Sequence, residues 1–230
     1  MLDFETISIN SLIPYDGILG VTSSNVIAYS NGNDSFYSNE SYFMNGIFMG
    51  MKWQCVEFAR RWTFIRKSSI FKSVDGAKDM WTQLKFIERV SDKKQFPLKH
   101  HPNGSPKMPS NESYLIYSQQ KDMPYGHVAI IVQVLHDKIR IAEQNYEFHQ
   151  WKNNYSREIS LIFKNNRYFL QDDYEILGWI QIIDQNRSLK SFDESMRVNA
   201  MSLVSSNIRI EFNYFLFSFI IFSKIFYQLF

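Results

Sequence analysis

Apolar side chains recur along residues 55–66 with the spacing of a helix. They stand at i, i+3, i+4, i+7 and i+10, at Cys55, Phe58, Ala59, Trp62 and Ile65. This spacing predicts a helix with one continuous buried stripe. Glu57 and Arg61 are one turn apart, and we expect them as an ion pair on the surface of that helix.

The rest of the pattern predicts a second helix and a sheet. Ser73 is a fair N-cap for a helix whose buried stripe holds Ala77, Met80, Trp81, Leu84 and Ile87. Residues 96–112 are rich in Pro, Gly and Asn and predict a long loop. Apolar runs predict strands at 114–117, 127–134, 158–163, 167–170 and 174–183. We therefore expect an α+β fold, with N-terminal helices packed on an antiparallel β-sheet.

Composition divides the chain into a domain over residues 1–185, a polar linker over 186–205 and an apolar tail over 206–230. The apolar run is about long enough to cross a bilayer, but Lys224 within it is costly in lipid. Three interpretations stay open: a membrane anchor, a helix packed on the domain, or the end of a truncated chain. We expect the domain to fold without residues 200–230.

Charge and cysteine content exclude several classes of protein. The chain has 25 basic and 23 acidic residues, a net charge of +2, and no basic cluster of the kind that binds nucleic acid. A single cysteine excludes an internal disulfide. The absence of paired cysteines and of an HExxH motif argues against a metal site, and we expect no cofactor. The N-terminus lacks the regions of a signal peptide, so we expect a cytoplasmic protein.

The single cysteine is the first candidate for chemistry. A lone Cys beside aromatic residues is usually a small buried hydrophobe. Cys55, however, stands where a helix is expected to begin, and unpaired N–H groups and the helix dipole there favour the thiolate. Downstream, His127 heads an apolar strand and Glu143 lies near the end of the next one. Together they predict a catalytic set of cysteine, histidine base and carboxylate.

Two residues could orient the imidazole of His127. Glu143 and Asn145 alternate along the expected strand and so face the same way, and either a carboxylate or an amide can hold the ring. Glu143 is preferred because it would also stabilise the imidazolium. An amide can still orient the ring, so we expect Glu143→Gln to keep part of the activity.

If Glu143 contacts His127, the hairpin between their two strands must be irregular. A regular two-residue turn at His136-Asp137 would leave Glu143 facing away from His127, because a shift of one residue reverses the face of a strand. An odd-length loop or a β-bulge is therefore expected in the segment 132–142.

Two residues near the cysteine are candidates for substrate contacts. Gln54 precedes the nucleophile and could donate, with the Cys55 N–H, to a developing oxyanion. Arg60 is turned away from Cys55 on an ideal helix. It either binds a substrate carboxylate or is a solvated charge, and the sequence leaves both open.

Five segments together resemble one family. They are Trp53-Gln54-Cys55-Val56-Glu57-Phe58-Ala59-Arg60-Arg61-Trp62, Pro102-Asn103-Gly104-Ser105-Pro106, Gly126-His127-Val128-Ala129-Ile130-Ile131, Arg140-Ile141-Ala142-Glu143-Gln144-Asn145 and Ile176-Leu177-Gly178-Trp179. They are similar to the amidase half of bifunctional glutathionylspermidine synthetase/amidase, a CHAP domain with a papain-like fold. The resemblance spans roughly residues 12–185. It implies Cys55 as nucleophile, His127 as base and Glu143 as third member, with Gln54, Arg60 and Asn145 around the substrate.

The resemblance also implies a function. We expect a cysteine amidase that hydrolyses the amide between glutathione and spermidine through a thioester on Cys55, without the ATP-dependent synthetase. Its partner would be a small glutathione–polyamine conjugate. Two alternatives stay open: a CHAP endopeptidase acting on peptidoglycan peptides, and a catalytically silent remnant that binds substrate or a partner.

Overall fold

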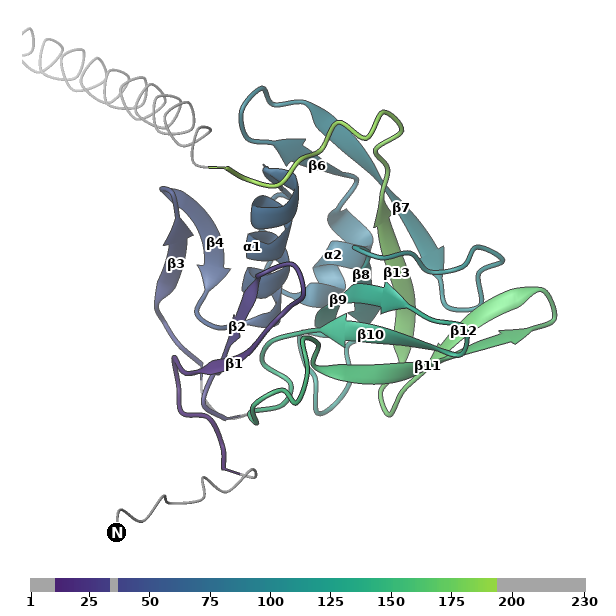
Figure 1. Ribbon diagram of the computed structural model, residues 1–230, viewed down its shortest axis with the longest axis horizontal. Coiled ribbons are helices and arrows are strands. Elements are labelled where there is room, and N and C mark those ends of the chain that lie inside the picture. The colour runs from purple at the N-terminus through teal and green to yellow at the C-terminus, as the bar shows by residue number, and fades with distance from the viewer. Residues whose placement is uncertain (1–10, 34–36, 194–230) are drawn as a thin grey trace, which may run out of the picture. The chain divides into compact units, whose positions relative to one another are not determined.

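The computed structural model describes residues 11–33 and 37–193. Within these ranges lie two helices, α1 (Cys55–Lys67) and α2 (Ala77–Gln83) (Figure 1). The strands are β1 (Ile18–Val21), β2 (Ile27–Tyr29), β3 (Ser41–Met44), β4 (Ile47–Met51), β5 (Ser69–Ile70), β6 (Phe86–Arg89), β7 (Gln95–Pro102), β8 (Tyr114–Tyr117), β9 (His127–Val134), β10 (Lys138–Ala142), β11 (Arg157–Lys164), β12 (Arg167–Gln171) and β13 (Ile176–Ile182).

The apolar tail and most of the predicted linker lie outside the described residues. Among the residues that are described, no helix is both long enough and apolar enough to cross a membrane. The three interpretations of the tail therefore remain as stated from the sequence.

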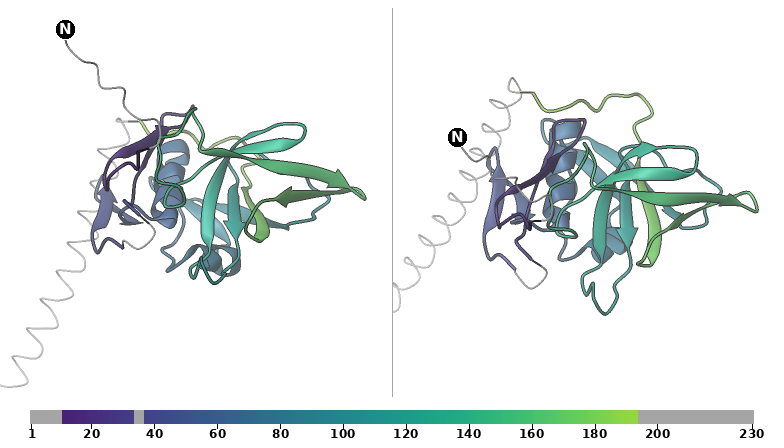
Figure 2. Two further views of the ribbon diagram at one scale, coloured as in Figure 1. Left: turned by 90° about the horizontal axis from the view of Figure 1, so that it is seen from below. Right: turned by 60° about the horizontal axis from the view of Figure 1, so that its bottom comes forward.

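Nine strands form one sheet, in the order β12-β11-β10-β9-β8-β13-β7-β6-β5 (Figures 1 and 2). Every neighbouring pair in it is antiparallel. Two hairpins, β1–β2 and β3–β4, stand apart as two-stranded sheets. The strands β8, β9 and β10 occupy the middle of the large sheet, and β9 begins with a candidate catalytic residue.

Strand β9 is buried on both faces, which explains its continuous apolar run. Val128 and Ile130 belong to a core cluster that includes Phe58 and Trp62 of α1. The alternate residues of β9, among them Ile131, belong to a second cluster built with residues of β10, β11 and β12. Because side chains alternate along a strand, β9 separates two cores and fixes the position of α1 against the sheet.

The expected α+β class, with N-terminal helices packed on an antiparallel sheet, is wrong. The fold is mostly β: the helices have 13 and 7 residues, against a nine-stranded sheet and two further hairpins within the described ranges. The strands expected at 114–117, 127–134, 158–163, 167–170 and 174–183 are confirmed as β8, β9, β11, β12 and β13. The helix that begins at Cys55 is confirmed as α1.

Two misread segments contribute to the difference. The helix expected to reach Ile87 ends at Gln83, because Leu84 is already extended, and β6 follows. Leu84 and Ile87 are buried as expected, but the i, i+3 spacing of two residues does not require a helix. The expected loop over 96–112 contains β7, whose side chains alternate between buried and exposed. Its two prolines lack the N–H that a strand donates, which is why the segment read as a loop.

Candidate active site

Cys55 is the first residue of α1, and it is 9% exposed. Gln54 before it has an extended backbone, with φ −78° and ψ 157°, so the helix begins at the cysteine itself. Backbone N–H groups in a first turn have no partner within the helix and carry the positive end of its dipole. Backbone hydrogen bonds at Val56 and Val128 also reach the thiol. This environment favours the thiolate, the reactive form of cysteine.

His127 begins β9, and its imidazole lies close enough to the Cys55 thiol for each group to shift the pKa of the other. The residue before it, Gly126, has a φ of +68°, a conformation that suits glycine. A Cβ at this position would lie 2.8 Å from the carbonyl oxygen of Tyr117, the residue that pairs with His127 across the strands. Glycine therefore lets the chain turn closely against β8 and present the imidazole to α1.

Glu143 completes the set. Its Oε2 lies 3.0 Å from Nε2 of His127, and the two side chains are 2% and 3% exposed. Because Nε2 faces the carboxylate, Nδ1 is the ring nitrogen left for Cys55. Strand β10 ends at Ala142, so Glu143 and Asn145 do not share a strand as expected. The structure places Glu143, not Asn145, against the ring.

The predicted β-bulge is confirmed. Strands β9 and β10 join through a turn at His136-Asp137, and their register shifts between Arg140 and Ile141. Arg140 pairs with Gln133, whereas Ile141 pairs with Ile131. The extra residue moves Ile141, and Glu143 after it, to the face of the sheet that carries His127.

The three groups shift one another's pKa values. Burial opposes ionisation of the Cys55 thiol, but the charge and hydrogen bond of His127 bring its pKa below the ordinary value. Burial likewise opposes charge on His127, yet Cys55 and Glu143 raise the pKa of its imidazole to about 9. For Glu143, burial is outweighed by His127 and Arg157, which lower the pKa of the carboxyl. The favoured state is thiolate, imidazolium and carboxylate.

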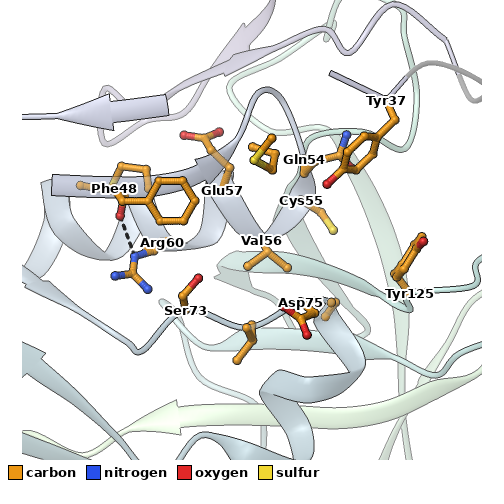
Figure 3. A pocket seen from close by; sticks show the side chains of 16 residues that line it. Tyr37, Phe48, Gln54, Cys55, Val56, Glu57, Arg60, Ser73, Asp75 and Tyr125 are labelled. Atoms are coloured by element: carbon orange, nitrogen blue, oxygen red, sulfur yellow. Dashed lines mark hydrogen bonds between the residues drawn. The ribbon is translucent and has the colours of Figure 1, made fainter. Parts of the chain in front are cut away.

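A cavity of about 400 Å³ opens beside Cys55 (Figure 3). The sulfur lies near one end of the view, together with Gln54 and Tyr125, and Arg60 lies toward the other end. His127 is absent from the lining of this cavity. The thiol therefore has its base on one side and open space for a substrate on the other.

Asn145 is hydrogen-bonded to Gln54, which lines the cavity next to Cys55. Asn145 Nδ2 donates to Gln54 Oε1 at 2.9 Å, and Gln54 Nε2 lies 3.4 Å from Asn31 Oδ1. The bond from Asn145 fixes the orientation of the Gln54 amide, whose NH₂ group donates one hydrogen to Asn31 and has a second N–H left. The structure thus brings both predicted substrate-contact residues to the nucleophile.

Arg60 is buried rather than solvated. It is 7% exposed, and its Nε donates to the carbonyl oxygen of Phe48 at 3.0 Å. Its Nη1 is buried without a hydrogen-bond partner among residues 11–33 and 37–193, although Arg60 lines the cavity. Burial lowers the pKa of its guanidinium to about 10, so the group is charged at neutral pH. Of the two roles left open by the sequence, solvated charge is excluded.

Other residues near the site were not found from the sequence. Arg157 binds the carboxylate of Glu143, with Nε 2.7 Å from Oε1. Gln144 binds Glu57 and the Gln54 carbonyl oxygen. Glu57 itself is fully buried, which corrects its expected surface position. Arg157 lies outside the five segments, and Glu57 and Gln144 lie within two of them without a role that the local sequence indicates; the strand register and the helix phase bring all three to the site.

A thiolate, an imidazolium and a carboxylate beside an open cavity form the kind of site that hydrolases with a cysteine nucleophile use. Residues 46–145 match the CHAP domain family, so the resemblance stated from the sequence is confirmed and the chain carries a CHAP domain.

Three known proteins show how far the likeness extends. The chain is 36% identical over 194 residues to bifunctional glutathionylspermidine synthetase/amidase of Escherichia coli (strain K12), covering 76% of this chain and 30% of that protein. It is 33% identical over 174 residues to trypanothione synthetase of Crithidia fasciculata, covering 73% and 26%. The crystal structure of Ly7917 has a TM-score of 0.31 and 13% identity, covering 56% and 53%. The chain thus spans less than a third of the length of these two sequence relatives.

Proposed function

We propose that this chain is a cysteine amidase that hydrolyses the amide joining the glycine of glutathione to spermidine. The observation that carries the proposal is the buried Cys55–His127–Glu143 set at the edge of a cavity. The E. coli relative's name joins a synthetase and an amidase. A nucleophilic thiol with its own base is the chemistry of amide hydrolysis, so the amidase activity is the one we assign.

The first half of the reaction forms a thioester. The Cys55 thiolate attacks the glycyl carbonyl carbon, and the carbonyl oxygen becomes an oxyanion. The Cys55 N–H and the second N–H of the Gln54 amide, the one not directed at Asn31, donate to it, interactions worth about 3 kcal/mol each in comparable sites. The His127 imidazolium then gives its Nδ1 proton to the departing amine nitrogen, the C–N bond breaks, and spermidine leaves.

The second half restores the enzyme. Neutral His127 takes a proton from water, and the resulting hydroxide attacks the thioester carbonyl. The C–S bond breaks, glutathione leaves with a new carboxylate, and Cys55 returns to the thiolate beside a protonated His127. Glu143 remains ionised throughout and stabilises the imidazolium in both halves.

Arg60 supplies a contact for the glutathionyl part. A buried guanidinium whose Nη1 has no protein partner is a strong donor for a carboxylate. In the conjugate the glycine carboxyl of glutathione is part of the scissile amide, so the γ-glutamyl carboxylate is the one that remains. The cavity connects Arg60 with Cys55, and we therefore assign Arg60 to anchor this carboxylate while the thiolate attacks the glycyl amide.

The test is hydrolysis by the full chain of two substrates, glutathionylspermidine and a peptidoglycan peptide. Mass spectrometry of the products should show spermidine and glutathione from the conjugate, none from a Cys55→Ala control, and little cleavage of the peptide. Cleavage of the peptide alone would replace the proposal with the endopeptidase alternative. Cleavage of neither would favour the silent, binding-only alternative.

A further inference from the structure

Arg157 at the start of β11 holds the third member of the catalytic set. Its guanidinium spans the Glu143 carboxylate, with Nε 2.7 Å from Oε1 and Nη2 3.5 Å from Oε2. The same guanidinium donates from Nη1 to Asp172 Oδ2 at 2.6 Å and from Nη2 to the Tyr117 hydroxyl at 3.0 Å. The ring of Tyr146 lies 4.0 Å from its centre. The strand register places Arg157 opposite Ile141, two residues before Glu143.

We propose that Arg157 is a positioning residue that fixes the orientation and the charge of the Glu143 carboxylate, and through that carboxylate the tautomer of His127. The inference rests on the proposed catalytic set but not on the proposed substrate. No step of the reaction requires Arg157 to touch the substrate.

The two oxygens of Glu143 have different partners. Oε1 accepts from Arg157 Nε and from the Ser156 hydroxyl, which lies 3.1 Å away. Oε2 faces Nε2 of His127 at 3.0 Å. An ionised carboxylate only accepts, so Nε2 must carry a proton in both states of the ring. Nδ1 is then the nitrogen that exchanges a proton with Cys55.

Arg157 also maintains the charge of Glu143. Burial opposes the charge of Arg157, but Glu143 and Tyr117 raise its pKa above the ordinary value, so it stays a cation. The titratable groups that face the pair, from all the elements packed around it, are Cys55, Tyr117, His127, Tyr146 and Asp172. Without the cation, a buried carboxylate takes up a proton more readily.

This arrangement reverses the expectation for Glu143→Gln. With Arg157 in place, the new amide must direct its oxygen to the Arg157 donor, and its NH₂ group then faces His127. An NH₂ group only donates, so Nε2 loses its proton and the neutral ring carries it on Nδ1, facing Cys55. In a serine-hydrolase triad the wrong tautomer lowers kcat on the order of 10⁴-fold. We expect a loss on the order of 10³- to 10⁴-fold here.

The decisive variant combines Glu143→Gln with Arg157→Met. Without the guanidinium, the new amide can rotate and present its oxygen to the Nε2–H of His127, while the Ser156 hydroxyl accepts from the NH₂ group. The double variant should therefore be at least roughly tenfold more active than Glu143→Gln alone. Arg157→Gln serves where Arg157→Met fails to fold, because its side-chain amide can donate or accept.

The primary readout is alkylation of Cys55 by iodoacetamide as a function of pH. The chain has a single cysteine, so the rate reports this thiol alone and needs no substrate. Arg157→Met should move thiolate formation to higher pH, Arg157→Lys should keep it near wild type, and Glu143→Gln should move it furthest. Turnover of glutathionylspermidine is measured in parallel, where kcat should change and KM should not.

Arg140→Met is the matched control. Arg140 lies on the neighbouring strand, is 32% exposed and pairs with Glu158 rather than with Glu143. Its loss should change neither profile. The inference would be overturned by a double variant no more active than Glu143→Gln, or by an alkylation–pH profile of Arg157→Met equal to that of the wild type. Alkylation profiles that shift as predicted, without turnover of the conjugate by the unaltered chain, would overturn the proposed substrate and leave the role of Arg157 standing.

Discussion

Two adjacent arginines on α1 are both buried, yet their surroundings differ completely. Arg61 donates to both oxygens of Glu57, at 2.6 and 3.2 Å, to the carbonyl oxygen of Ile27 at 2.6 Å and to Gln144 Oε1 at 3.1 Å. Four aromatic rings surround its guanidinium, those of Tyr29, Tyr42, Trp53 and Phe58. Arg60 has one hydrogen bond from Nε, one ring near it, and a buried Nη1 without a partner at the cavity.

The difference shows that burial alone does not identify a functional arginine. The donors of Arg61 are directed into the protein, where Arg61 and Gln144 tie α1 to β2 and to the segment that follows Glu143. Arg60 has a donor without a partner among the described residues, on a side chain that lines the same cavity as Cys55. A buried donor without a partner is costly, and this supports the proposed role of Arg60 in binding.

The largest effect should come from Arg61→Leu. Removing one partner of a buried ion pair leaves Glu57 uncompensated and costs about 3–5 kcal/mol of the free energy of unfolding. Combining it with Glu57→Leu should cost less than the sum of the two single changes. Denaturant unfolding measures both.

Arg66→Leu on the same helix is the control, because this partly exposed residue pairs with Glu112 at the surface. Its loss should cost no more than about 1 kcal/mol. An Arg61→Leu protein as stable as the control would show that the buried network does not support the fold.

Arg60→Met should affect substrate binding rather than stability. Loss of a charged hydrogen bond to a carboxylate corresponds to about 1.5–3 kcal/mol, or roughly a 10- to 100-fold rise in KM for the conjugate. The free energy of unfolding should stay the same or rise, because an unpartnered buried donor disappears. KM from steady-state kinetics and the free energy of unfolding, measured on the same preparation, distinguish a binding role from a structural one. An unchanged KM with a large loss of stability would assign Arg60 to the fold, as for Arg61.

The smallest effect is expected in the pH dependence of kcat/KM, which further separates the role of Arg60 from that of the catalytic pair. Cys55 forms its thiolate above a lowered pKa, so kcat/KM rises as pH passes through that value. His127 loses its proton near pH 9, so the rate falls above that pH, because the departing amine is no longer protonated. Arg60→Met should lower the whole kcat/KM curve and move neither limb. A displaced limb would mean that Arg60 acts on the catalytic pair instead of the substrate.

The sequence was most informative where a residue type occurs once or where an apolar pattern extends over many residues. A single cysteine at a helix start, and a histidine at the head of an apolar run, located two members of the site. The number of residues in the β9–β10 turn, together with side-chain alternation, predicted the bulge that turns Glu143 toward His127. Side-chain alternation is a local property, and a short hairpin transmits it without tertiary information.

What the sequence did not predict depends on contacts between distant segments. Glu57 and Arg61 read as a surface pair because nothing local shows that β2 and Gln144 meet that side of α1. Arg157 begins an ordinary strand, and only its pairing with β10 brings it to Glu143. The prolines of β7 hid a strand because their effect on pairing depends on the neighbouring strands.

The most direct test of the account is the mass of the intact chain, acid-quenched during turnover of glutathionylspermidine. The account predicts a glutathionyl adduct on Cys55, released as free glutathione at longer times, and no adduct in Cys55→Ala. Fragmentation of the adduct locates the thioester on the cysteine. Steady hydrolysis without any adduct on Cys55, or hydrolysis that persists in Cys55→Ala, would contradict a covalent cysteine mechanism.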